Sequence, residues 1–582
     1  MNTIRTSQEH TFTASDGKEL FYRAWLPVAP QTDKCFILLH RGHEHSARLQ
    51  HIVDGLNMPD VPMFAMDARG HGRTEGPRGY SPSVARSVLD LDEFVKHICT
   101  TYHIDITNIM LIAQSISAVY ASAWVHDYAP HIRGMVLASP AFSIKLYVPF
   151  ACEGISLWQK IRGQHFFVSS YVNAKFLTHD PARQESYNTD PLISKAIASN
   201  ILLEIAQLGK RIVADARAIY TPTQVFISGS DVVVHHTPQH KFYERLSSPI
   251  KEKHVMEGFY HDTLGEQNRA LVFDKMRTFI ENIYSTPYTP HDYSNEDRWS
   301  QPADEYRDLQ APASFPKSIF YKITRFGFDT IGQLSDGLKL GKQIGFNAGG
   351  MLDYVYRNQP SGRFLIGKWF DKMYLKTPGW EGIRQRKINL QNVISQTIEK
   401  LRAQNKPVFI FDPAAGRGKY ILDLLKTTSA DHVLLRDFDA QNVKAIQEAV
   451  RENGLSEQVT GEQGDAFQVE KTASVTPKPT LAVVSGFYEI FPTNEGIKKS
   501  LEGLSKAVEK GGFLIYTAQP YHPQLELIAR TLRDLESPDK LWIMRARTQG
   551  EMDFLVEKAG FVKQSQIIDK WGMFSVSVAQ KQ

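Results

Sequence analysis

Short apolar runs alternate with longer amphipathic segments along the first half of the chain. Five such runs, bounded by glycine, proline or polar clusters, lie at residues 34–40, 61–67, 108–114, 132–139 and 223–229. Strand-length runs separated by helix-length segments predict strand–helix–strand units and a mostly parallel sheet. Because this alternation stops near residue 285, we predict an α/β domain over residues 1–285.

The second half begins with a change of pattern. Residues 286–316 are rich in proline, aspartate and tyrosine and have no apolar period, so they predict an interdomain linker. Apolar residues spaced three and four apart predict that residues 317–404 are largely helical. A second α/β alternation then fills residues 405–582, with strands expected at 408–411, 432–437, 481–486 and 512–519 and a terminal hairpin at 562–579.

Composition narrows the class of protein. The 582 residues are too many for one ordinary core, and 67 basic against 63 acidic side chains give a net charge of only +4. This balance argues against a nucleic-acid partner, which would need a concentrated basic surface. The three scattered cysteines predict no disulfide framework.

Without an apolar leader or a membrane-spanning run, we expect a cytoplasmic protein with small-molecule or lipid-like substrates. Peripheral contact with a membrane and the oligomeric state stay open.

Ser115 is the candidate nucleophile of the first half. It follows an apolar strand and precedes a helix-like segment. A serine in such a turn can attack a carbonyl when a base and oxyanion donors stand beside it. Asp231 and His261 each follow an expected strand, and the order Ser, Asp, His is that of an α/β-hydrolase. We expect His261 to take the Ser115 proton and Asp231 to fix the His261 tautomer.

The surroundings of Ser115 both support and weaken this prediction. The loop at residues 40–48 would place the backbone N–H of Gly42 beside that of Ile116 as an oxyanion hole. The small residues on either side of the serine are Ala113 and Ser117, where this motif usually has glycines. Three histidines in the loop lack a carboxylate at metal-ligand spacing, so no metal site is predicted.

At these positions the first half resembles the monoacylglycerol lipase/lysophospholipase group of α/β-hydrolases, of the serine aminopeptidase S33 type. The family's His-Gly-x-Gly-Glu-His-Ser loop is matched by residues 40–46, with Arg41 and His43 replacing glycines. Its Asp-x-x-Gly-His-Gly-x-Ser-x-Gly segment is closely matched by residues 67–76. The resemblance implies a serine ester hydrolase for monoacylglycerol- or lysophospholipid-like esters, with an acyl-binding cap at about residues 140–200. The alternatives are that this insertion packs as core, or that the substrate is a small ester, thioester or amide.

A glycine loop preceded by an acidic residue opens the second α/β segment. Asp412, Ala414, Gly416 and Gly418 follow the first expected strand in the order Asp-x-x-x-Gly-x-Gly. A dinucleotide site needs a third glycine where this chain has Ile421, so a nicotinamide-dependent reaction is the weaker alternative. S-adenosylmethionine has no phosphate to hold, and the glycines admit its methionine portion close to the backbone.

Further acidic residues agree with this cofactor. Asp437 ends the second strand, where it can accept the ribose hydroxyls while Asp439 caps the next helix. The reverse assignment stays open. Asp465, followed by Ala466, is placed to contact the adenine amino group. Four residues are candidates for a general base or for acceptor positioning, each with a structural role as the alternative: Tyr488, Glu489, Tyr516 and His522.

The second half resembles the class I S-adenosylmethionine-dependent methyltransferases, which have a Rossmann-like α/β fold. With residues 317–404 it is similar to a bacterial group in which such an enzyme follows an α/β-hydrolase, and the segments 485–492, 514–530 and 542–561 carry this narrower resemblance. Residues 317–404 would then form a helical cap over cofactor and acceptor. We expect a bifunctional enzyme that cleaves a carboxylic ester and methylates a small or lipid-like acceptor. The alternative is that one half, first of all the hydrolase, is an inactive binding module.

Overall fold

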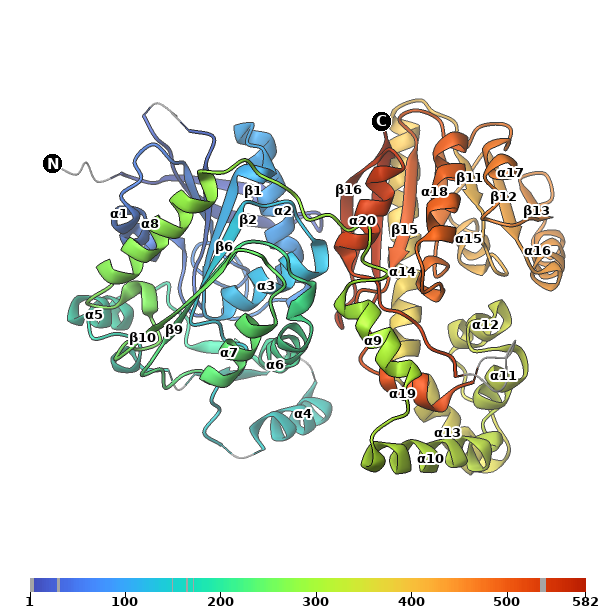
Figure 1. Cartoon of the computed structure of the whole chain (residues 1–582), viewed down its shortest axis with the longest axis horizontal. Helices are drawn as coiled ribbons and strands as arrows, with labels where there is room; N and C mark the ends of the chain where they lie inside the picture. Colours follow the sequence, from blue (N-terminus) through green and yellow to red (C-terminus); the bar gives the residue numbers. More distant parts are fainter. Residues whose placement is uncertain (1–4, 29–31, 149, 164–165, 171, 534–540) are drawn as a thin grey trace. The chain divides into compact units, whose positions relative to one another are not determined.

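The chain folds into two compact units, Met1–His291 and Asp292–Gln582, which are described separately (Figure 1). The coordinates are those of a computed structural model. It describes residues 5–28, 32–148, 150–163, 166–170, 172–533 and 541–582.

Unit 1 is an α/β domain around one eight-stranded sheet with the order β1-β2-β4-β3-β5-β6-β9-β10. The strands are β1 (Gln8–Thr13), β2 (Glu19–Trp25), β3 (Cys35–Leu39), β4 (Met63–Met66), β5 (Ile109–Gln114), β6 (Gly134–Ala138), β9 (Thr223–Ser228) and β10 (Lys251–Met256). From β4 to β10 all neighbours are parallel, whereas β2 pairs antiparallel with both β1 and β4. The five strands expected in the first half are confirmed; β1 and β2, before residue 34, were not predicted.

Helices cover both faces of this sheet, which explains why β3, β5 and β6 are buried along their whole length. Helices α1 (Gln50–Leu56) and α8 (Ala270–Tyr284) share one apolar cluster with the strands. Four further helices, α2 (Val84–Tyr102), α3 (Ile116–Tyr128), α6 (Ser199–Ala214) and α7 (His236–Arg245), pack in pairs, α2 on α3, α3 on α6 and α6 on α7. The insertion after β6 contains α4 (Ala151–Arg162), β7 (Phe167–Ser169), α5 (Pro181–Thr189) and β8 (Ala196–Ala198).

Unit 2 contains a seven-stranded sheet with the order β13-β12-β11-β14-β15-β17-β16. Its strands are β11 (Phe409–Asp412), β12 (His432–Asp437), β13 (Val459–Gln463), β14 (Leu481–Val484), β15 (Phe513–Ala518), β16 (Phe561–Ile568) and β17 (Ser575–Lys581). Only β17 runs antiparallel to its neighbours. The expected strands and the hairpin are confirmed, and β13 was not predicted. The chain order reverses between β11 and β14, and ligands of such sheets bind outside the carboxyl ends of the strands at this point.

The remaining helices of unit 2 fall into two groups. Those between the strands are α15 (Lys419–Leu424), α16 (Ala440–Glu452), α17 (Val469–Ala473), α18 (Glu495–Ala507), α19 (Leu525–Thr531) and α20 (Gln549–Lys558). Those before the sheet are α9 (Gln301–Gln310), α10 (Phe315–Asp329), α11 (Asp336–Ile344), α12 (Gly349–Arg357), α13 (Phe364–Leu375) and α14 (Pro378–Ala403). The helical character expected for residues 317–404 is therefore found, and α14 buries Leu390 and Ile394 against the sheet.

Helix α9 corrects one sequence-based expectation, because it lies inside the stretch read as a linker. Ser300 caps it by accepting from the Ala303 N–H at 3.3 Å, and Leu309 is buried against Leu525 and Ala529. One capping serine and one buried leucine are enough to hold this short helix against its neighbours. Because a single apolar residue gives no repeating pattern, the sequence did not predict the helix. Among the described residues, no helix of either unit combines the length and the apolar character that a membrane span needs.

Candidate active sites

Ser115 occupies a strained turn between β5 and α3. Its φ of 59° and ψ of −121° are unusual for a residue other than glycine. Backbone hydrogen bonds hold the turn, since the Ser115 N–H donates to Ala138 at 2.9 Å and its carbonyl accepts from Ala141 at 3.1 Å. The hydroxyl is thereby fixed at the carboxyl end of the sheet, at the first turn of a helix.

His261 connects Ser115 to Asp231. Its Nε2 lies 2.8 Å from Ser115 Oγ, and its Nδ1 lies 2.8 Å from Asp231 Oδ2. The other Asp231 oxygen accepts from the backbone N–H of Val233 at 2.7 Å and Val234 at 3.0 Å. Burial alone would raise the pKa of Asp231, but His261 and these N–H donors lower it below its ordinary value. A carboxylate at Nδ1 keeps the proton there and leaves Nε2 free to accept from the serine.

The two residues that replace the usual glycines are accommodated. Ala113 is fully buried in β5, and the Ser117 hydroxyl donates to the His40 carbonyl. The turn at Ser115 therefore closes without glycine on either side.

Four of the predicted residues line one cavity: Ser115, His261, Gly42 and Ile116. The residues after β6 supply much of its apolar wall, namely Leu146, Val168, Val172, Leu177 and Ile197. His43 also lines it, and burial lowers the pKa of this imidazole to about 4, so it is neutral near pH 7. Asp231 lies behind His261 rather than in the wall.

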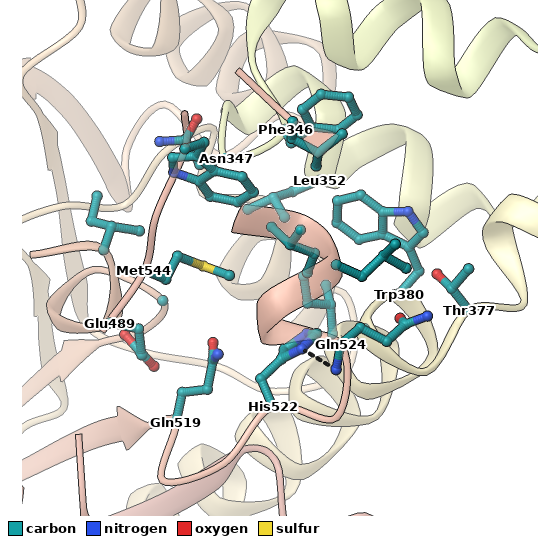
Figure 2. Close-up of a pocket in the computed structure, with 18 of the residues that line it drawn as sticks. Phe346, Asn347, Leu352, Thr377, Trp380, Glu489, Gln519, His522, Gln524 and Met544 are labelled. Atoms are coloured by element: carbon teal, nitrogen blue, oxygen red, sulfur yellow. Dashed lines mark hydrogen bonds between the residues drawn. The ribbon is translucent and has the colours of Figure 1, made fainter. Parts of the chain in front are cut away.

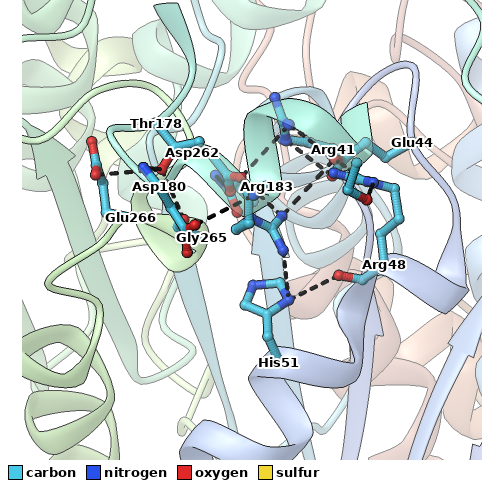
Figure 3. Close-up of polar contacts among 12 residues, drawn as sticks. Arg41, Glu44, Arg48, His51, Thr178, Asp180, Arg183, Asp262, Gly265 and Glu266 are labelled. Carbon is cyan, nitrogen blue, oxygen red and sulfur yellow. Dashed lines mark hydrogen bonds and ion pairs between the residues drawn. The ribbon is translucent and has the colours of Figure 1, made fainter. Parts of the chain in front are cut away.

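Arg41, which stands where the related loop has a glycine, belongs to a buried ionic network (Figure 3). Its guanidinium donates to both oxygens of Glu44, each at 2.9 Å. Arg48 Nε donates to the same carboxylate at 2.6 Å. Burial would raise the pKa of Glu44, but Arg41 and Arg48 lower it to about 2.

The same network reaches Gln114 and Asp262, the neighbours of Ser115 and His261 in the chain. Asp262 accepts from Arg183 at 2.9 and 3.0 Å and lies 3.6 Å from Arg41. Gln114, the last residue of β5, donates to the side chain of Asp262 and to the carbonyl of His261, both at 3.1 Å. The loop at residues 40–48, the end of β5 and the loop that carries His261 are thus held together by hydrogen bonds and ion pairs. None of these partners was predicted from the sequence, because they come from four separate segments.

The second candidate site begins at Asp412, the last residue of β11. Its carboxyl accepts from the Ala414 N–H at 2.9 Å and from the Tyr420 hydroxyl. The side chain is fully buried, and burial raises its pKa to about 7 despite these two donors. Asp412 and Ala414 therefore set the conformation of the loop that follows.

Gly416 and Gly418 give this loop its shape. Both have a positive φ, 58° and 64°, which favours glycine. A Cβ on Gly418 would lie 2.6 Å from Leu435 Cδ1, so this glycine is needed for packing of helix on strand. A Cβ on Gly416 would find no atom nearer than Gly349 Cα at 4.0 Å. The loop backbone at Gly416 thus faces open space that a side chain would fill.

Asp437, at the end of β12, is fixed by three donors. It accepts from the Gly416 N–H at 2.8 Å, the Asp439 N–H at 3.0 Å and Asn442 Nδ2 at 3.1 Å. Burial raises its pKa. Asp439 is the cap residue of α16 and accepts from the Gln441 N–H at 2.9 Å. Of the two assignments left open by the sequence, the structure therefore places the helix cap at Asp439.

Asp465 and Ala466 follow β13 at the same end of the sheet. Asp465 accepts from the Phe467 N–H at 2.9 Å, and Ala466 is buried. The Phe467 ring stacks on Phe487 with centroids 5.2 Å apart. The predicted cofactor residues thus all lie at, or directly after, the carboxyl ends of β11, β12 and β13.

A largely apolar pocket lies beside the ends of β14 and β15 (Figure 2). In Figure 2, Glu489, Gln519 and His522 lie on one side, across from Phe346, Leu352 and Trp380. The Thr517 hydroxyl donates to Glu489 Oε1 at 2.6 Å. The buried atoms Glu489 Oε2 and Gln519 Nε2 have no hydrogen-bond partner within the described chain.

His522 lines the same pocket as a neutral imidazole. Burial lowers its pKa to about 4. Its Nδ1 accepts from the Gln524 N–H at 3.1 Å, so the proton lies on Nε2. His522 can therefore donate a hydrogen bond to a bound molecule but cannot serve as a base through Nε2.

The structure places the two tyrosine candidates away from this pocket. Tyr488 and Tyr516 are buried, and their hydroxyls lie 3.0 Å from Ser500 Oγ and 2.6 Å from Asp553 Oδ1. Neither lines the pocket, so both act as core residues. Gln519 was missed, although its place directly after the strand 513–518 marks it as a candidate.

Comparison with known proteins agrees with this division of the chain. A family model described as "Serine aminopeptidase, S33" matches residues 30–268, and one described as "Putative methyltransferase" matches residues 276–581. The protein thus joins an α/β-hydrolase domain to a putative methyltransferase domain. It belongs to the putative methyltransferase family, whose model covers more than half of the chain. The protein described as "Uncharacterized protein YnbC" of Escherichia coli (strain K12) is of the same family, being 52% identical over 583 residues, with 100% of this chain and 99% of that one covered.

Other relatives match the first half alone. The monoacylglycerol lipase of Mycolicibacterium smegmatis is 25% identical over 284 residues, which cover 47% of this chain and 97% of that one. The monoglyceride lipase of Homo sapiens is 24% identical over 261 residues, covering 42% of this chain and 81% of that one. The crystal structure of Paleococcus ferrophilus monoacylglycerol lipase covers 45% of this chain and 99% of its own, with 19% identity and a TM-score of 0.41.

Proposed function

We propose that the protein is a bifunctional enzyme, a serine ester hydrolase joined to an S-adenosylmethionine-dependent methyltransferase. The two 2.8 Å contacts of His261, to Ser115 and to Asp231, carry the first half of the proposal. The open space at Gly416, whose N–H donates to Asp437, and the pocket beside the ends of β14 and β15 carry the second. The hydrolase would correspond to residues 1–285, a helical cap to 317–404 and the methyltransferase to 405–582, with the segment 286–316, which contains the docked helix α9, between them.

In the proposed hydrolysis Ser115 Oγ attacks the ester carbonyl while His261 Nε2 takes its proton. Asp231 holds Nδ1–H and stabilises the imidazolium that forms. The backbone N–H groups of Gly42 and Ile116 stabilise the negative oxygen, since Ile116 is the first residue of α3 and its N–H has no partner within the helix. His261 then returns the proton to the leaving alcohol. A water molecule, deprotonated by His261, then attacks the acyl group on Ser115, and His261 returns this proton to Ser115 Oγ as the acid leaves.

The wall of the hydrolase cavity favours an ester with an acyl chain. Residues from the insertion at about 140–200 face the nucleophile with valine, leucine and isoleucine side chains. Burial of apolar surface contributes roughly 0.8 kcal/mol per methylene group. A monoacylglycerol- or lysophospholipid-like ester is therefore preferred over a short-chain ester, and kcat/KM should rise with acyl length.

Labelling with a fluorophosphonate tests the hydrolase. The wild type is expected to label at Ser115, and Ser115→Ala is expected not to. Ser122→Ala, which removes another buried hydroxyl from α3, is the matched control and should label normally. A folded wild type that does not label would refute the hydrolase and favour an inactive binding module.

The residues of the second site fit S-adenosylmethionine. When bound, this cofactor supplies a methyl group already activated on a sulfonium. The open face at Gly416 admits its methionine portion, and Asp465 with Ala466 lies where adenine is expected. A carboxylate has about four acceptor sites, of which three are used at Asp437, so Asp437 would accept one ribose hydroxyl.

Calorimetric titration with S-adenosylmethionine tests this half. Asp437→Ala should weaken binding strongly, and Gly416→Val should do the same because its side chain enters the open space. Asp439→Ala is the matched control, since it removes only a helix cap. Unchanged affinity in Asp437→Ala, or tight binding of a nicotinamide dinucleotide instead, would refute the assignment.

The pocket beside Glu489 defines the acceptor that this half would methylate. Its apolar side fits a carbon skeleton, while Glu489 Oε2 can accept and Gln519 Nε2 can donate one hydrogen bond each. Buried polar atoms are normally paired, so an acceptor carrying both an N–H or O–H group and an acceptor atom would satisfy them. Glu489 would orient the acceptor atom that receives the methyl group, and would take its proton where the transfer releases one. The pocket itself would hold this atom close to the methyl donor. A small or lipid-like acceptor fits these requirements.

A further inference from the structure

Helix α10 of unit 2 presents its apolar side to solvent. Phe315, Ile319, Ile323 and Phe326 recur every three or four positions, so they lie on one face of the helix. Their exposed fractions run from 46% for Ile319 to 79% for Phe315. No residue described in this helix is fully buried. A helix that only covers a core has the opposite arrangement.

Helix α13 exposes apolar residues in the same way. Leu365, Trp369 and Met373, spaced four apart, are 86%, 56% and 52% exposed. Both helices contact the turn η6 (Ile331–Leu334), and Figure 1 shows them at the same end of unit 2. We call the exposed residues of α10 and α13 the docking face: Phe315, Ile319, Phe320, Ile323, Phe326, Phe364, Leu365, Ile366, Trp369 and Met373.

The orientation of α13 is fixed from inside by a carboxylate. Asp371 is fully buried and accepts from Ser335 Oγ at 2.6 Å, from the Gly337 N–H at 2.9 Å and from the Ser361 N–H at 2.9 Å. Rotating the helix to hide its apolar residues would break these bonds and leave a buried charge unpaired. The apolar face is therefore held outward by the fold.

Basic side chains border the docking face. Arg363, Lys368, Lys372 and Lys376 are exposed on or beside α13, whose one acidic residue is the buried Asp371. Lys322 is exposed on α10. Exposed aromatic and aliphatic residues bordered by lysine and arginine are typical of helices that lie in the headgroup region of an anionic bilayer. A second copy of this chain would instead bring like charges together.

The docking face adjoins the pocket of the second candidate site. Phe328, on α10, lines that pocket together with Leu338 and Phe346. We propose that the docking face binds an anionic lipid bilayer, and that a lipid acceptor enters the pocket from it. The proposed binding to a bilayer is supported by the exposed residues of the docking face and does not depend on the methyltransferase. The proposed entry of an acceptor rests on the proposed methyltransferase function.

Vesicle sedimentation with the full chain tests the binding. Vesicles of phosphatidylcholine with phosphatidylglycerol are compared with vesicles of phosphatidylcholine alone. We expect binding to the anionic vesicles that weakens with salt. It should fall by about tenfold or more in Phe315→Ser/Phe326→Ser/Leu365→Ser/Trp369→Ser, which removes four of the inserted side chains.

Two control variants locate the contact. Leu271→Ser/Val562→Ser removes exposed apolar residues from α8 and β16 and should bind like the wild type. Leu157→Ser/Trp158→Ser removes exposed residues of α4 in unit 1. Loss of binding in this second control, with full binding by the docking-face variant, would overturn the proposal. So would equal binding to both vesicle types, or a dimer that dissociates only in the docking-face variant.

Titration with S-adenosylmethionine separates the two proposals. The docking-face variant should keep the wild-type affinity for the cofactor, which also shows that unit 2 is folded, and should lose methyl transfer to vesicle lipid. If the wild type binds vesicles but no cofactor, the methyltransferase proposal fails and the docking proposal stands. If the variant methylates vesicle lipid as fast as the wild type, entry of the acceptor across this face is refuted.

Discussion

Replacing Arg41 by methionine tests whether the buried network of unit 1 holds the hydrolase site together. Methionine keeps the apolar part of the side chain and removes the guanidinium. The variant loses two hydrogen bonds of 2.9 Å to Glu44 and a contact of 3.6 Å to Asp262. Glu44 then keeps Arg48 at 2.6 Å and, more distant, Arg183 at 4.0 Å as ionic partners.

Two estimates of the unfolding free energy lost in Arg41→Met agree in size. Removing one partner of a buried ion pair costs about 3–5 kcal/mol of unfolding free energy. Lowering the pKa of Glu44 from 4.5 to about 2 corresponds to roughly 3 kcal/mol. Since Arg48 supplies part of that shift, we expect a loss of about 3 kcal/mol in Arg41→Met.

The pH dependence has a definite sign. A carboxyl with a depressed pKa stabilises the folded state fully above its unfolded value of 4.5, and this contribution disappears as the pH falls through about 2. The difference between wild type and Arg41→Met should therefore be full at neutral pH and shrink in acid.

Pulse proteolysis in urea measures this difference for unit 1 alone, because mass spectrometry tells the fragments of the two units apart. Lys96→Met is the matched control: it removes an ion pair of 2.7 Å to Asp92 in which the lysine is 41% exposed. Such pairs contribute less than about 1 kcal/mol. The double variant Arg41→Met/Glu44→Gln should lose less than the sum of its single changes, because the stranded charge is gone. If Arg41→Met destabilises no more than Lys96→Met, the network is not structural and the reasoning fails.

Three further outcomes are expected. Asp231→Asn should lower kcat/KM for ester hydrolysis by about 10⁴ with an unchanged melting temperature, because the wrong imidazole tautomer is held; a loss below tenfold would contradict the proposed triad. Asp412 should contribute about 4 kcal/mol to the stability of unit 2 below pH 3.8 and lose this contribution as the pH rises to about 7, since burial raises its pKa and favours its neutral form. Asp412→Asn should remove this part of the pH dependence in pulse proteolysis, and an unchanged pH dependence would contradict the assignment. Glu489→Gln should lower kcat for methyl transfer by about 10² or more and leave the Kd for S-adenosylmethionine unchanged, whereas a shift in Kd alone would place Glu489 at the cofactor.

The sequence could predict residues that stand at strand ends. Parallel strands of alternating α/β units carry their functional residues at one edge of the sheet, so apolar runs ending in a polar residue locate the site. Ser115 after β5 and Asp231 after β9 were identified in this way in unit 1. Asp437 at the end of β12 was identified in the same way in unit 2.

Other parts of the sites could not be read from the chain. Adjacent residues of one segment point in different directions, so the motif around Tyr488 could not show that Glu489 faces the pocket while Tyr488 is buried in the core. Arg386, on α14, and Trp380 line the same pocket from the helices before the sheet, where an amphipathic pattern marks the buried side but not what lies opposite. Arg183 approaches Asp262 across a separation of 79 residues, a distance at which a single sequence carries no pairing information.

Both candidate sites combine an apolar wall with a few polar groups at one side. In unit 1 the wall comes from the insertion after β6, and in unit 2 it comes from the helices before the sheet. In both units, therefore, the strand ends supply the groups for chemistry, while a separate cap supplies the apolar surface that selects the substrate. A lipid with one acyl chain and a polar head, of the kind proposed above for the two halves, would fit this arrangement in either cavity. The proposed reactions of the two halves share no catalytic group. We infer that the functional connection between the halves is the kind of molecule that both of them bind.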